Sequence, residues 1–254
     1  MRAALVRGRL VTMLLAVVAL GWWTTVERMR GMDAGPWTGL GSLGWFVGLW
    51  IVMMAAMMLP TVIPTVAVYD DLRNDRTLLA PLLFLAGYLA IWVGAGLVAY
   101  TVAAAGDRIA DDALAWNEAG RWAAGVTLLL AAVYELTPLK DACLARCRSP
   151  IAFMLGSWRP GRSGGLRMGA THGAWCAGCC WALMVSLFAL GVMSIAWTAL
   201  VAGLVALEKI FPWRRVATWG TAALLISLSL LILLAPGLVP ALQLPGGGGM
   251  SMSG

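Results

Sequence analysis

The chain has 254 residues, of which 61% are hydrophobic and only 12% are charged. Soluble globular domains carry about 25% charged residues, so this composition excludes an ordinary water-soluble fold of this size. The formal net charge of +6 does not indicate nucleic-acid binding, because the Lys and Arg residues lie in short segments between apolar stretches and form no basic face.

Long apolar stretches alternate with short charged ones, which predicts an all-α polytopic transmembrane helical bundle. No alternating strand pattern is present, and each stretch approaches the ~20 residues that a bilayer core requires. We expect one transmembrane domain over residues 1–240. Its seven predicted spans are residues 10–26, 42–69, 78–104, 120–137, 168–190, 192–210 and 214–236.

Two of these spans allow a second interpretation. The first could be a signal peptide, but it runs into Trp22 and Trp23 without a small-residue cleavage site, so we expect a retained helix. The fifth and sixth spans form one apolar run from Met168 to Leu207. We divide this run near Gly191, and a single long, tilted helix is the alternative.

The loop charges predict the orientation of the chain. With the N-terminus in the cytoplasm, fourteen of the eighteen Lys and Arg residues lie inside. The positive-inside rule therefore predicts a multi-pass protein of the bacterial inner (cytoplasmic) membrane, with the N-terminus in and the C-terminus out. We expect the Gly-rich and Met-containing tail, residues 241–254, to be disordered.

The fifth span contains the sequence H-G-A-W-C-A-G-C-C-W, which includes the sole histidine of the protein. His172, Cys176 and Cys179 would lie within about 60° on one helix face, with Cys180 beside them. An ionisable group inside a membrane is costly, so this cluster is a candidate metal site. The alternative is that small residues here simply allow close helix packing.

A second cysteine pair, Cys143 and Cys147, follows the fourth span at i and i+4, provided that the segment is helical. This spacing suits capture of a soft metal or a redox pair. Both cysteine motifs are assigned to the cytoplasmic side, where thiols are normally reduced, and this favours metal ligation over a disulfide. Five cysteines are also an odd number, which argues against a purely structural set of bridges.

The second span adds thioethers, with Met53/Met57 and Met54/Met58 each at i and i+4 near Pro60. Thioethers suit Cu(I), although a methionine stripe can equally be ordinary core. Glu135 could complete a metal shell, orient His172 or pair with Lys140.

Two acidic residues near predicted span ends are not expected to bind metal. Asp70, followed by Asp71, and Glu208, followed by Lys209, are expected to be solvated at the membrane interface.

Four segments of the chain are similar to a known family. They read A-M-M-L-P, G-Y-L-A-I-W, L-T-P-L-K-D-A-C-L-A-R-C-R-S-P and H-G-A-W-C-A-G-C-C-W-A-L-M, and they run from about Met53 to Pro212. They resemble a bacterial family of predicted metal-binding integral membrane proteins, a domain of unknown function. The resemblance implies metal ligands at Met57, Glu135, Cys143, Cys147, His172, Cys176, Cys179 and Cys180.

The leading hypothesis is a membrane protein that binds a soft transition metal, Cu(I) first and zinc second, for transport, buffering or delivery. The expected partners are the lipid bilayer, the metal ion and a metallochaperone or membrane-complex partner. No nucleotide-binding motif is present in the sequence, so any ATP-driven step would need a partner protein. One alternative is a membrane thiol-disulfide oxidoreductase that uses paired cysteines, although a non-enzymatic role is favoured. Another is a haem or structural subunit of a membrane complex.

Overall fold

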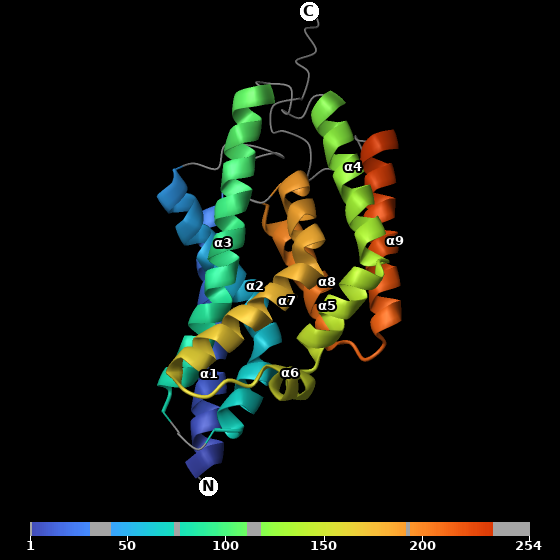
Figure 1. The fold of residues 1–254 in the computed structure, drawn as a ribbon. Helices are drawn as coiled ribbons and strands as arrows, with labels where there is room; N and C mark the ends of the chain where they lie inside the picture. The colour runs from blue at the N-terminus through green and yellow to red at the C-terminus, as the bar shows by residue number, and fades with distance from the viewer. Residues whose placement is uncertain (1, 31–41, 74–76, 111–117, 192–193, 236–254) are drawn as a thin grey trace, which may run out of the picture.

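The computed structural model describes residues 2–30, 42–73, 77–110, 118–191 and 194–235, and these residues form helices without a strand. Most of the longer helices run roughly side by side, and the short helices α5 and α6 lie below the lower end of α4 in the view of Figure 1. The elements in chain order are α1 (Arg2–Met29), α2 (Leu43–Asp71), α3 (Leu79–Ala110), α4 (Glu118–Glu135), α5 (Pro138–Arg148), α6 (Pro150–Ser157), α7 (Arg162–Leu190), α8 (Ile195–Ile210) and α9 (Arg214–Leu234).

The all-helical class is confirmed for the described residues, and each predicted span has a matching helix. Five helices, α1, α2, α3, α7 and α9, are long and apolar enough to cross a membrane. The pair α4 and α5, bent by 67° at its break, would make a sixth. Helix α8 has 16 residues, fewer than the ~20 of a typical span. The count of seven spans and the orientation stay predictions.

The break in the long apolar run occurs where the sequence predicts it. Helix α7 ends at Leu190, and Gly191 adopts a φ of 110°. Such positive φ values favour glycine because it has no Cβ. Helix α8 then begins at Ile195, so the alternative of one long, tilted helix is wrong.

Two N-capped helix starts determine how the chain folds between α4 and α7. Thr137 precedes Pro138 and accepts a hydrogen bond from the Lys140 backbone at 3.3 Å, which starts α5. Ser149 precedes Pro150 and accepts one from the Ala152 backbone at 3.4 Å, which starts α6. A hydroxyl residue at the N-cap with proline at the first helical position is a strong start signal, so this segment folds as two short helices.

Helices α3 and α7 make the most extensive contact in the bundle. Glycines allow this approach, because a Cβ on Gly169 would overlap the Phe84 carbonyl oxygen and one on Gly87 would overlap the Leu166 carbonyl oxygen. Small residues at helix crossings permit such close backbone contact. The predicted disordered tail, residues 241–254, lies outside the described residues.

Candidate metal site

Helix α7 presents its histidine and three cysteines to the interior. His172, Cys176, Cys179 and Cys180 are all buried, with exposures of 0 to 1%. The sulfurs of Cys179 and Cys180 donate hydrogen bonds to the Cys176 carbonyl oxygen, at 3.1 and 3.0 Å. The helical spacing inferred from the sequence is therefore confirmed, and the thiols gather about one turn of the helix.

The second cysteine motif joins the first. Cys143 and Cys147 lie on α5, which confirms the helix assumed for that segment. The Cys147 thiol is in hydrogen-bond contact with the sulfurs of both Cys176 and Cys179. The sequence treats the two motifs as separate clusters, whereas the structure brings Cys147, Cys176, Cys179 and Cys180 together. We call these four residues the thiol cluster.

Cys143 lies beside the thiol cluster. A Cβ on Gly178 would be 3.1 Å from Cys143 Sγ, so the absence of a side chain at Gly178 lets this thiol pack against the α7 backbone. Tyr134 of α4 donates a hydrogen bond to the Gly178 carbonyl oxygen at 2.6 Å. Helices α4 and α5 are thus both fixed to the same part of α7.

Three polar contacts converge on the thiol cluster from other helices. Tyr88 of α3 is hydrogen-bonded to Cys176 Sγ through its hydroxyl at 2.9 Å. Lys209 at the end of α8 donates to the same sulfur at 2.8 Å. The Lys209 ammonium also contacts Thr61 Oγ1 at 3.4 Å and Met58 Sδ at 3.8 Å, both on α2. Helices α2, α3, α5, α7 and α8 therefore meet at Cys176.

His172 lies one turn from Cys176 inside a set of aromatic rings. Its ring centroid is 4.8 Å from that of Phe153, 6.0 Å from Tyr88 and 6.1 Å from Phe84. His172 Nδ1 is buried without a hydrogen-bond partner in the structure. Leaving a buried imidazole nitrogen without a partner costs free energy. A ligand bound at this nitrogen would remove that cost.

Glu135 pairs with Lys140, one of the three roles considered for it. The Lys140 ammonium contacts Glu135 Oε2 and lies 2.6 Å from Glu208 Oε2. All three side chains are at most 2% exposed, so the expectation that Glu208 is solvated at an interface is wrong. We call Glu135, Lys140 and Glu208 the buried triad. Each charge of the buried triad has a partner of opposite sign, and this pairing offsets the cost of burying it.

The remaining predicted positions also lie in the interior. Met53 and Met57 are 2 and 3% exposed within the core of α2, and the methionine that reaches Lys209 is Met58. Asp70 is 1% exposed and lies 3.7 Å from Arg73 Nη1. The prediction of a solvated Asp70 is therefore wrong, because the turn after α2 folds Arg73 back over it.

The thiols are not in disulfides, and the described residues do not form a preformed site with three or more metal ligands. All five cysteines are unpaired. Within the described ranges, no group of three or more His, Cys, Asp or Glu side chains is placed to hold a metal ion. Zn²⁺ sites are usually tetrahedral with four ligands, whereas Cu(I) selects soft sulfur ligands and a pair of thiolates can hold it.

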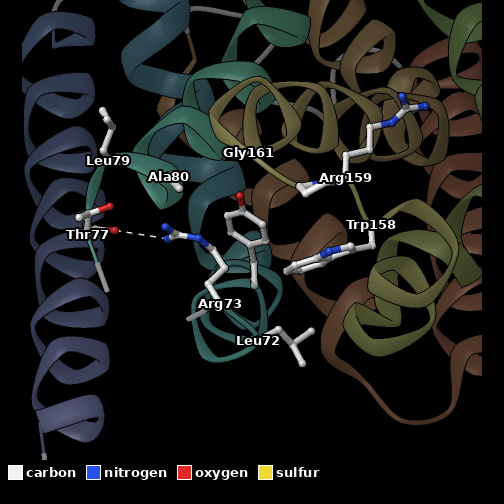
Figure 2. Close-up of a pocket in the computed structure, with 10 residues that line it drawn as sticks. Leu72, Arg73, Thr77, Leu79, Ala80, Trp158, Arg159 and Gly161 are labelled. Carbon is white, nitrogen blue, oxygen red and sulfur yellow. Dashed lines mark hydrogen bonds between the residues drawn. The ribbon is translucent and has the colours of Figure 1, made fainter. Parts of the chain in front are cut away.

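A separate pocket of about 270 Å³ lies between the end of α2, the start of α3 and the segment before α7. Figure 2 shows Arg73 directed toward Thr77, where its Nη1 donates to the Thr77 carbonyl oxygen at 3.3 Å, whereas the Arg159 side chain extends away. The pocket is lined by none of the metal-ligand candidates. It is therefore distinct from the thiol cluster.

Sequence reasoning missed Lys209 and Tyr88 as neighbours of the cysteines, and it considered Met58 only as one member of the methionine stripe on α2. One signal was present: only two of the eighteen basic residues are lysines, Lys140 and Lys209. Lys140 occurs inside the first cysteine motif, and both ammonium groups point into the protein interior.

A comparison with protein families gives a match over most of the chain. The family model described as PpoB2, a copper chaperone, matches residues 47–232, which include every residue of the thiol cluster and of the buried triad. No curated protein and no solved structure matches the chain.

Proposed function

The chain belongs to the PpoB2 copper chaperone family, and we propose that it binds Cu(I) within a membrane through the thiol cluster and passes it to a partner. Membership of this family supports copper binding and delivery in general. The thiol cluster is proposed as the copper site because Cys147 of α5 lies against Cys176 and Cys179 of α7.

The proposed ligands are sulfurs of the thiol cluster, with Cys176 at the centre. The thiolate is the form of cysteine that binds metals, and Cys176 Sγ already has an ammonium and a hydroxyl within hydrogen-bond distance. Two further candidate donors are His172, one helical turn before Cys176 on α7, and Met58, whose sulfur lies 3.8 Å from Lys209 Nζ. Cys143, beside the cluster on α5, would exchange the metal with a partner.

We also propose the membrane location and the seven-span arrangement. The support is the five long apolar helices, the bent pair α4 and α5, and the many large apolar side chains exposed on the outside of the bundle, such as Leu155 and Leu234, 83 and 80% exposed. Sodium carbonate extraction of cell membranes should leave the protein in the pellet. Reporter fusions at residues 30 and 235 should give an outside signal, and a fusion at residue 158 an inside one.

Thiol-disulfide chemistry is the second candidate function. The adjacent free thiols of Cys176, Cys179 and Cys180 favour it, because closely spaced thiols can cycle to a disulfide. A redox enzyme would show a reversible loss of two titratable thiols per protein and no stoichiometric metal. A copper-binding protein would keep its thiols reduced and protect them from alkylation when it is loaded.

The test is anaerobic Cu(I) titration of the purified full-length protein against a chromophoric Cu(I) chelator. Wild type should retain stoichiometric Cu(I) and release it to an added acceptor. Cys176→Ser should lose it, and Cys143→Ser, the matched thiol beside the cluster, should show a smaller loss. Equal retention by wild type and Cys176→Ser would exclude the thiol cluster as the copper site.

A further inference from the structure

Lys209 contacts the thiol cluster with its charged end. The ammonium donates to Cys176 Sγ at 2.8 Å, to Thr61 Oγ1 at 3.4 Å and to Met58 Sδ at 3.8 Å. An ammonium has three donors, so these three acceptors account for all of them. The same group interacts electrostatically with all four cysteines of the thiol cluster.

The chain's other lysine serves a different set of charges. Lys140 is held between the carboxylates of Glu135 and Glu208. Nearby, Arg148 of α5 donates to the Glu208 carbonyl oxygen at 2.7 Å and also to the Phe211 carbonyl oxygen. The buried triad and Arg148 thus fix the end of α8, and Lys209 is the cation directed at the sulfurs.

From this geometry we infer that Lys209 is the counter-cation of a two-thiolate complex and makes the thiol cluster selective for a monovalent soft cation. The inference rests on the proposed function. Two thiolates and one Cu(I) or Ag(I) ion carry a net charge of −1, which the ammonium neutralises. Two thiolates and Zn²⁺ are already neutral, so the ammonium would leave an excess positive charge.

Burial makes this difference in net charge between the Cu(I) and Zn²⁺ complexes energetically important. An uncompensated charge in a low-dielectric interior is expensive, and a nearby opposite charge offsets that cost. Cys176 and Cys180 are at most 1% exposed, so water contributes little screening there. Lys209 therefore acts as a positioning and specificity-determining residue, because it stabilises the complex without being a ligand of the metal.

The test compares Cu(I), Ag(I) and Zn²⁺ affinities of the full-length protein in Lys209→Leu and Lys209→Arg. Lys209→Leu removes the charge and adds no metal-binding atom, so its Kd for Cu(I) and for Ag(I) should rise by about tenfold or more. Its Kd for Zn²⁺ should stay constant or fall. Lys209→Arg should keep the wild-type order of preference.

Arg215→Leu is the matched control, since it removes one positive charge from an exposed site close to Lys209 in the chain. It should leave all three affinities unchanged. If Lys209→Leu cannot be purified as a folded protein, Lys209→Gln replaces it. Thermal unfolding and size-exclusion profiles of each variant report folding independently of metal.

The outcomes separate this inference from the proposed function. A selective loss of monovalent affinity in Lys209→Leu supports the inference. An equal loss for Cu(I) and Zn²⁺, or no loss, overturns it and leaves the copper site in place. If wild type itself binds no Cu(I) at Cys176, the proposed function fails together with the inference that depends on it.

Discussion

The hydroxyl group of Tyr88 lies 2.9 Å from Cys176 Sγ, although 88 residues separate the two positions. This contact joins α3 to the middle of α7 and depends on how closely the two helix backbones approach. A Cβ on Gly173 would lie 2.9 Å from the Tyr88 carbonyl oxygen, so the same small residues that allow the helix crossing also place the hydroxyl at the sulfur.

Gly169→Ala should lower stability and copper affinity together. The added methyl group would overlap the Phe84 carbonyl oxygen, and overpacking of this kind costs about 1–3 kcal/mol. Thermal unfolding and Cu(I) titration measure the two effects. Gly94→Ala on α3, where a Cβ meets open space, is the control and should be neutral or slightly stabilising, since Ala exceeds Gly in helix propensity. Unchanged stability in Gly169→Ala would contradict the close packing.

Lys140→Met should be strongly destabilising. It leaves Glu135 and Glu208 buried beside each other without a cation, and breaking a buried ion pair costs about 3–5 kcal/mol. The triple variant with Glu135→Gln and Glu208→Gln should recover much of the lost stability, because no unpaired charge remains. Asp141→Asn, which breaks the more exposed pair with Arg214, should cost no more than about 1 kcal/mol. A triple variant no more stable than Lys140→Met would exclude charge as the cause.

His172→Phe should separate packing from metal binding. Phenylalanine suits the setting formed by Phe84, Tyr88 and Phe153, so thermal stability should change by less than about 1.5 kcal/mol. The Cu(I) affinity should fall because the imidazole nitrogen is lost. Wild-type Cu(I) affinity in a stable His172→Phe variant would assign His172 to packing alone.

Copper loading should raise the melting temperature, and a Cu(I) chelator should reverse the increase. A ligand that binds only the folded state stabilises it by about 2.7 kcal/mol at a free concentration of 100 times Kd. Cys176→Ser should show no such increase at the same Cu(I) concentration. A comparable increase in Cys176→Ser would indicate that copper binds elsewhere.

Local features of the site could be predicted from the sequence, because they depend on short-range spacing. The face shared by His172, Cys176 and Cys179 follows from helical periodicity, and the α5 helix that carries Cys143 and Cys147 follows from Thr137 and Pro138 at its start. The break at Gly191 was likewise predictable from the length of the apolar run.

Contacts between helices could not be predicted in the same way. Glu208 and Lys209 occur at the end of an apolar helix, where charged residues are usually solvated. Glu208 is buried because α5 supplies Lys140 to it, and the partly buried Lys209 is directed inward because Cys176 lies beside its ammonium. For the same reason Met58 rather than Met53 or Met57 reaches the site, since only the rotation of α2 in the bundle decides which methionine faces it.

The most direct test of the account is a double-mutant cycle of Cu(I) affinity with Cys147→Ser, Cys176→Ser and the double variant. Because the two thiols are in contact and would hold one ion, either single substitution should abolish high-affinity binding, and the double variant should be no worse than the singles. Independent losses that add in the double variant would show two separate copper sites and would contradict a single site built from both cysteine motifs.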